Sequence, residues 1–320
     1  MSVADLIPLP DALPVHWLWF QGLLTLTFLL HLLVMNLLLG GGIIALVNQV
    51  RSSGDLALSR DVGKKLPYCL AFTVNFGVAP LLFLQVLYGQ FFYSSTVFMA
   101  WFWLSIIPLL IISYYLAYIH NSHFERLGDS RSVLLAVVLL ALLLIGFFFV
   151  NNLTMMQLPT SWGRFLSRPS GLLLNLADPT LWPRYLHFLL SALAVAGLAL
   201  ALLSRWQLGQ GRATAAAGLR QGVQWFTWST IGNFGVGFWF FGILPGHVRD
   251  VSTPHGAALA VCLLVGIAAA AFSVVMAQSR QLRPAVSSLL LSILAMVLLR
   301  DLVRGVYLKP YFSPASLPVQ

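Results

Sequence analysis

Long, uninterrupted runs of apolar residues dominate the chain, and short polar segments separate them. Several runs reach the roughly 20 residues that a helix needs to cross a bilayer. The strict alternation of apolar and polar positions that is typical of a membrane β-barrel is absent. The pattern therefore predicts an all-α, polytopic membrane bundle of about eight helices, at residues 16–49, 68–92, 96–121, 132–153, 184–204, 219–245, 256–278 and 284–303.

The composition fits a chain that folds in lipid. Hydrophobic residues make up 59% of the 320 residues and charged residues 8%, whereas soluble domains carry about 25% charged residues. The N-terminus lacks the basic segment and the small-residue cleavage site of a signal peptide, so we expect it to be retained. Because no linker or low-complexity segment divides the chain, residues 1–320 are treated as a single transmembrane domain.

The positive charges fall unevenly between the two sets of expected loops. The formal net charge is +9, but the basic residues are scattered, which argues against nucleic acid as a partner. The positive-inside rule assigns the more basic set of loops to the cytoplasm and both termini to the periplasm of a bacterial inner membrane. The residues of that set are Arg51, Arg60, Lys64, Lys65, Arg126, Arg131, Arg205, Arg212, Arg220, Arg280 and Arg283.

Two segments recur in the second half of the chain. LHLLVMNLLLGGG at 30–42 resembles LHFLLSALAVAG at 186–197, and NFGVAPLLFLQVLYG at 75–89 resembles NFGVGFWFFGILPG at 233–246. The offsets, 156 and 158 residues, nearly agree. We therefore expect a 4+4 parallel repeat with units of about 14–155 and 180–310, related by a pseudo-twofold axis along the membrane normal.

Two histidines occupy the same place in the two copies. A titratable side chain within hydrocarbon is costly unless it faces a partner, so His31 and His187 are candidates for function. Imidazole is a haem ligand, and the glycines at 40–42 would let a flat macrocycle approach the backbone. We expect both histidines to bind b-type haem; a histidine hydrogen-bonded between helices is the alternative for His31.

Further side chains are candidates to complete such sites. His247 and His255 flank a short loop on the side of the termini, and Met155 closes a helix on that side. Each is a candidate sixth iron ligand, or a residue with only a loop or packing role. Five arginines near that boundary are candidate partners of haem propionates, or interfacial anchors: Arg164, Arg168, Arg184, Arg300 and Arg304.

The remaining titratable residues and the cysteines argue against several classes of function and cofactor. All nine Asp and Glu residues are expected in termini, loops or helix ends, which argues against a proton-coupled transporter. His120 and His123 are expected on a solvated face. The two cysteines, Cys69 and Cys262, lie in different helices outside any CxxC motif, so covalent haem c, an iron–sulfur cluster and a disulfide are not expected.

With these residues in place, the chain resembles subunit I of cytochrome bd quinol oxidase from about Pro14 to Gly246. The similarity rests on five segments in the family's order: FLLHLLVMNLLLGGG, NFGVAPLLFLQVLYGQ, HFERLGD, MMQLP and RYLHFLLSALAVAG. The resemblance implies that His31 ligates a haem of the oxygen-reducing pair and that His187 ligates the low-spin haem b.

The chain also departs from that family. Gln85 stands where the family has an acidic residue, Leu264 stands where it has a haem-ligating methionine, and its large quinol-binding loop shrinks to Pro245–His255. We therefore expect a subunit of a quinol-linked oxidoreductase complex with two haems b that carries electrons between the quinone pool and a periplasmic c-type cytochrome. The alternatives are a bd-type quinol oxidase subunit that reduces oxygen, a 4+4 repeat transporter and a haem-free anchor subunit.

Overall fold

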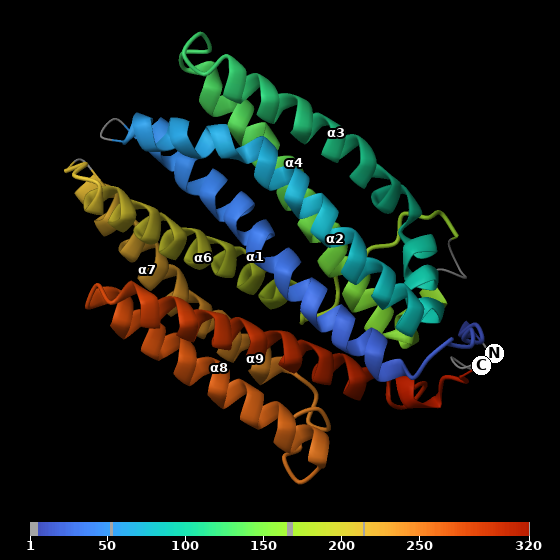
Figure 1. Ribbon diagram of the computed structural model, residues 1–320. Helices are drawn as coiled ribbons and strands as arrows, with labels where there is room; N and C mark the ends of the chain where they lie inside the picture. Colours follow the sequence, from blue (N-terminus) through green and yellow to red (C-terminus); the bar gives the residue numbers. More distant parts are fainter. Residues whose placement is uncertain (1–5, 52–53, 165–168, 214, 320) are drawn as a thin grey trace.

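A computed structural model describes residues 6–51, 54–164, 169–213 and 215–319, and these form a helix bundle (Figure 1). The described part contains no β-strand beyond one isolated bridge between Leu13 and Val319. The prediction of an all-α, polytopic membrane bundle is confirmed. The long helices are α1 (Trp17–Val50), α2 (Leu56–Phe98), α3 (Ala100–Ser122), α4 (Ser130–Gln157), α6 (Leu181–Gly209), α7 (Ala215–Ile243), α8 (Pro254–Gln278) and α9 (Leu282–Leu308), with single 3-10 turns η2 (Pro159–Ser161) and η3 (Pro314–Ser316).

Within the described residues, seven of the long helices are both long and apolar enough to cross a membrane. The exception is α7, whose hydropathy is lowered by glycine, tryptophan and polar residues such as Asn233, although it packs along α6 like the other members of the bundle. The outward faces are apolar; on α3, for example, Ile107 and Ile111 are 60% and 63% exposed. Such a surface is stable only against lipid, so the chain is a multi-pass membrane protein.

The second helix begins well before its predicted start. Arg60, Lys64, Lys65 and Pro67 interrupt the apolar run, so the hydropathy pattern predicts a helix that starts only at 68. In the structure, the side chain of Asp55 accepts the backbone N–H of Leu58 at 2.9 Å and caps a helix that starts twelve residues earlier. This extension buries one of its faces, so helical packing rather than continuous apolarity sets where α2 begins.

The helices pack in an order that repeats between the two halves. Helix α1 packs against α2 as α6 packs against α7, and α3 packs against α4 as α8 packs against α9. The two halves meet where α1 crosses α6, with smaller contacts of α4 with α6 and of α9 with α1. This is the arrangement expected of a 4+4 parallel repeat around a central α1–α6 crossing.

Both termini lie at one end of the bundle, which we call the terminal end (Figure 1). The backbone N–H of Leu13 donates to the carbonyl oxygen of Pro318 at 2.8 Å and joins the N- and C-terminal segments. The loops that join α1 to α2, α3 to α4, α6 to α7 and α8 to α9 lie at the opposite end. The more basic set of residues therefore lies at the end opposite the termini.

Candidate functional site

His31 lies on α1 with its ring against α2. Its Nδ1 is 3.0 Å from the carbonyl oxygen of Thr73. Because a carbonyl can only accept, Nδ1 carries the proton and Nε2 keeps its lone pair, the arrangement found in metal-ligating histidines. One helical turn further on, a Cβ atom at Gly77 would lie 2.9 Å from the His31 Cε1 atom, so only glycine leaves room for the ring there.

His187 lies on α6 with its ring against α7 in a similar way. The ring faces the backbone of Asn233, and a Cβ atom at Gly237 would lie 3.9 Å from Cε1. The Nδ1 atom is buried and has no hydrogen-bond partner. Each histidine therefore packs on the following helix of its own half, over a glycine and next to the backbone of the residue four positions earlier.

The register of this equivalence differs from the one read in the sequence. The contacts match Thr73 with Asn233 and Gly77 with Gly237, an offset of 160 residues, whereas the NFGV motifs match Gly77 with Gly235, an offset of 158. A Cβ atom at Gly235 would meet nothing within 4 Å. Apolar helices carry few distinctive residues, so a local motif match does not fix which residues face the histidine.

The described residues also contain a buried charged group near the terminal end, formed by Arg300, Asp301 and Arg304 of α9. The Oδ1 atom of Asp301 is 2.7 Å from Nη2 of Arg304 and 3.4 Å from Nη1 of Arg300. Its Oδ2 atom accepts bonds from Gln21 at 2.9 Å and Thr25 at 3.2 Å, both on α1. One carboxylate thus ties two guanidinium groups of α9 to α1.

This placement corrects the expectation that every carboxylate lies in a terminus, a loop or a helix end. The Asp301 side chain is only 12% exposed and lies about two turns inside α9. Helix α9 continues to Leu308, beyond the predicted end at 303, because its last turn packs into a core shared with α2 and α4. The donors from α1 then satisfy the buried carboxylate.

Aromatic rings connect this charged group to His31 and to α2. The guanidinium of Arg300 lies 4.3 Å from the ring centroid of Phe28, and the Phe28 ring lies 6.5 Å from the ring of His31. On the other side, the guanidinium of Arg304 lies 4.4 Å from the ring centroid of Tyr88 on α2. Both cations therefore rest on ring faces, which is a favourable arrangement away from water.

The third arginine of this region is Arg184, one turn before His187 on α6. Its Nε donates to Thr180 Oγ1 at 3.1 Å, and its guanidinium lies 5.0 Å from the ring centroid of Phe240. It is close enough to Arg300 for the two charges to repel each other. We call Arg184, Arg300, Asp301 and Arg304 the arginine cluster. The structure thus brings three of the predicted arginines together.

The arginine cluster carries more positive charge than its protein partners balance. Arg300 and Arg304 meet Asp301 directly, whereas Arg184 reaches Asp178 through Thr180, which donates to Asp178 Oδ1 at 2.8 Å. Arg304 is fully buried, and its Nε and Nη1 atoms have no hydrogen-bond partner. Unpaired guanidinium N–H groups in such a place are suited to bind an anion, and carboxylate and phosphate are the anions that match the planar guanidinium.

The other predicted ligands lie in three different settings. Met155 is fully buried; its sulfur accepts the Ser161 hydroxyl at 3.4 Å, and it packs in a core with Trp162. His247 is exposed, edge-on to the ring of Tyr307 at 6.5 Å. His255 is exposed near the start of α8. These contacts do not identify a sixth ligand.

Two segments at the terminal end, before α6 and between α7 and α8, contain a further predicted arginine and a carboxyl with a shifted pKa. Arg164 donates through Nη2 to the Asn175 side-chain oxygen at 2.5 Å, while Arg168 lies outside the described residues. Between α7 and α8, Asp250 accepts the hydroxyl and the backbone N–H of Ser252 at 2.6 and 3.0 Å. These bonds lower the pKa of the Asp250 carboxyl.

His120 is not on a solvated face, contrary to the sequence analysis; it is fully buried. Its Nε2 is 3.1 Å from Nε2 of Gln49, its ring is edge-on to Phe124, and a Cβ atom at Gly63 would lie 2.8 Å from Cε1. The early start of α2 explains the difference, because Gly63 lies in the part of α2 that precedes the predicted helix at 68–92. His123 is exposed, as expected.

Four residues that complete the site, Gln21, Thr25, Phe28 and Tyr88, are not among those predicted from the sequence. Gln21 and Thr25 are one helical turn apart in an otherwise apolar run, and that spacing was a usable signal of a shared polar partner. Phe28 and Tyr88 gave no such signal, because aromatic residues are equally common on lipid-facing surfaces. Their roles depend on which face of the helix meets α9.

Among the described residues, no group of three or more His, Cys, Asp or Glu side chains lies close enough to hold a bare metal ion. A haem iron needs only one or two axial side chains, since the macrocycle supplies the other ligands. The chain matches no protein-family model and no curated protein sequence.

Proposed function

We propose that this chain is a membrane b-type cytochrome subunit that transfers electrons between the quinone pool and a c-type cytochrome on the periplasmic side of a bacterial inner membrane. The observation that carries the proposal is the pairing of His31 and His187 with a buried arginine cluster. Each histidine lies over a glycine of the next helix, and two nitrogen atoms of the buried Arg304 guanidinium have no hydrogen-bond partner among the described residues.

The residues fit haem b in two respects. The Thr73 carbonyl holds His31 in the tautomer that leaves Nε2 free to bind iron. Arg300, Arg304 and Arg184 would hold propionates, because a haem brings two carboxylates to a region with excess positive charge. Bound haem supplies one-electron transfer. The protein contributes the axial histidines, the guanidinium partners and an apolar surround that keeps water out.

The depth of His187 favours exchange of electrons at the terminal end. It lies six residues after Leu181, the first residue of α6, which places it roughly 9 Å along the helix from that end. His31 lies fourteen residues after Trp17, or roughly 21 Å along α1. A partner protein docked at the terminal end would therefore meet the His187 site first, with the His31 site deeper in the bundle.

Spectroscopy of the purified protein tests the proposal. We expect reduced-minus-oxidised spectra typical of haem b, and a pyridine haemochrome content that falls when His31 or His187 is replaced by alanine. His123→Ala is the matched control, since His123 is an exposed histidine and should not change the haem content. A colourless wild-type protein, or haem content unchanged in both histidine variants, would rule the proposal out.

One observation favours a second candidate, a 4+4 repeat transporter. Asp301 is a buried carboxylate within α9, and intramembrane carboxylates are typical of transport pathways. Against it, Asp301 accepts bonds from Gln21, Thr25 and Arg304, which gives it a structural partner for each oxygen. Purified protein without haem that takes up a solute in vesicles, and loses uptake in Asp301→Asn, would support the transporter.

A further inference from the structure

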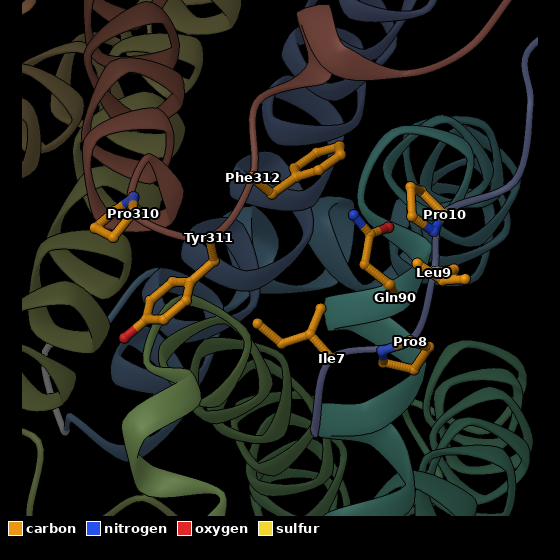
Figure 2. A pocket seen from close by; sticks show the side chains of 8 residues that line it. All are labelled: Ile7, Pro8, Leu9, Pro10, Gln90, Pro310, Tyr311 and Phe312. Atoms are coloured by element: carbon orange, nitrogen blue, oxygen red, sulfur yellow. The ribbon is translucent and has the colours of Figure 1, made fainter. Parts of the chain in front are cut away.

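A pocket of about 230 Å³ lies at the terminal end, between the N- and C-terminal segments and α2 (Figure 2). Residues 7–10 form one side and residues 310–312 the other. Apolar and aromatic side chains make up most of its lining, and no charged side chain contributes. The pocket therefore suits a neutral, largely apolar ligand.

Gln90 is the polar side chain of this pocket that lies within a long helix. It is only 8% exposed, and its Nε2 atom has no hydrogen-bond partner. Figure 2 shows its amide directed from α2 toward the ring of Phe312 and the segment at Pro10. A buried, unpaired amide N–H is costly, so a rotation of the side chain toward the pocket, where a ligand accepts a hydrogen bond from Nε2, would relieve that cost.

The pocket shares a wall with the arginine cluster. The Phe312 ring packs edge-on to the Tyr88 ring with 6.0 Å between ring centroids. The guanidinium of Arg304 lies over the same Tyr88 ring. Tyr88 has non-helical backbone angles (φ −135°, ψ 27°) and kinks α2 two residues before Gln90. Such local breaks in a helix occur frequently at functional sites. Tyr88, at the kink, therefore lies between Phe312 of the pocket and the buried Arg304.

We propose that this pocket binds the ring of a quinone, with Gln90 Nε2 donating to a ring carbonyl and the isoprenoid tail lying against the lipid-facing surface. A cavity of roughly 150 Å³ holds benzene, so the volume here suits a substituted six-membered ring. The lack of charge disfavours a phospholipid headgroup. The assignment rests on the proposed function, in which the quinone pool is the electron partner, and gives that partner a place on this chain.

Quinone binding to the full-length protein in lipid nanodiscs tests the assignment. Isothermal titration with a short-chain benzoquinone and a short-chain naphthoquinone should give saturable binding. Gln90→Met keeps the size of the side chain but removes the amide, and should weaken binding about tenfold. Gln224→Met is the matched control, because Gln224 is an exposed glutamine on α7. Ile7→Trp, which fills the pocket and leaves Gln90 in place, should also weaken binding.

Three outcomes would overturn the assignment. The first is equal affinity of the wild type, Gln90→Met and Ile7→Trp for both quinones. The second is no saturable binding by a wild-type protein of normal helicity. The third is binding of decanol as tight as that of the quinones, which would indicate a site for a lipid chain. The same titration on the His31→Ala/His187→Ala double variant separates this result from the haem proposal. Quinone binding without haem would leave the pocket standing and remove the cytochrome; haem without quinone binding would do the reverse.

Discussion

At the scale of single residues, Arg304 is the most constrained charged side chain in the described part of the structure. It is fully buried, it is paired with Asp301 at 2.7 Å, and it rests on the ring of Tyr88. A buried ion pair contributes little net stability when it is intact, but removal of one partner leaves the other charge buried without compensation. Replacement of Arg304 should therefore lower the stability of the fold and weaken the proposed binding of an anion by the arginine cluster.

Arg304→Met should lower the free energy of unfolding by about 3–5 kcal/mol, because Asp301 loses its closest cation while it stays buried. The double variant Arg304→Met/Asp301→Asn should recover part of that loss, since it removes both charges. Unfolding in mixed detergent micelles, followed by circular dichroism, measures both. Lys309→Met, at an exposed position on the same side of the bundle, is the control. A single variant as stable as Lys309→Met would contradict the role assigned to the pair.

Gly77 and Gly237 should respond differently to alanine. A Cβ atom at Gly77 would lie 2.9 Å from Cε1 of His31, which is closer than real contacts allow, whereas a Cβ atom at Gly237 would lie 3.9 Å from His187, an ordinary contact. Gly77→Ala should therefore displace the His31 ring and lower the haem content, while Gly237→Ala should be tolerated. Haem quantification of the two variants decides this. Equal haem in both would mean that the His31 ring has room to move.

A third glycine tests the register of the repeat. The sequence motif matches Gly77 with Gly235, but the contacts match it with Gly237. Leucine at 237 should disturb the His187 site, since its side chain would reach into the imidazole. Leucine at 235 should leave that site intact, because nothing lies within 4 Å of its Cβ position. Spectra of the two leucine variants compare the registers directly, and the opposite pattern would favour the motif alignment.

At the scale of helices, the α1–α6 crossing holds the two halves together. At Gly40 a Cβ atom would overlap the backbone of Ala192 and press on the side chain of Ala196. Close crossings of this kind depend on small residues at the contact. Gly40→Ala should destabilise the protein by about 1–3 kcal/mol. Gly41→Ala, whose Cβ atom would meet Val62 at 3.7 Å, should be close to neutral in the same unfolding measurement.

The sequence predicted the elements better than their ends. Every predicted helix is present, because an apolar run of this length has few other stable forms in lipid. The start of α2 was missed by twelve residues, since a hydropathy pattern ends where Lys64 and Lys65 begin, and the structure continues the helix past them. The same error hid the burial of His120. Where packing rather than apolarity sets the boundary, the sequence alone was insufficient.

The sequence predicted the charged and titratable residues of the candidate site, but not their neutral neighbours. His31, His187 and the arginines stand out in a lipid-facing sequence because each is costly without a partner. Their neutral partners do not stand out. Phe28 and Tyr88 differ little in cost whether they face lipid or protein, so only the three-dimensional packing shows that they border the arginine cluster. Gln90 is a polar residue in an apolar run, but its place in the pocket likewise follows only from the packing.

At the scale of the whole molecule, the repeat is symmetric in its helices and asymmetric in its charges. Both halves present a histidine over a glycine, but Arg300, Asp301 and Arg304 belong to α9 alone. Helix α4, which corresponds to α9 in the first half, has the neutral pair Asn151 and Asn152 buried near its terminal end. Since α9 also packs against α1, with Gln21 donating to Asp301, the charged group of α9 lies against the first half as well as the second. Loss of Arg304 should therefore affect the His31 and His187 sites together.

The orientation of the bundle decides which partners the terminal end can meet. Both termini lie there, and the more basic set of loops lies at the other end. The positive-inside rule then predicts that the terminal end faces the periplasm. Alkaline phosphatase fused after the C-terminus should be active, and green fluorescent protein fused there should be dark. The same reporters inserted after Gly128, in the α3–α4 turn, should give the opposite result. Fluorescence at the C-terminus would mean that the orientation is reversed and that the His187 site lies near the cytoplasmic face. It would then exclude a periplasmic cytochrome as the partner that docks next to that site.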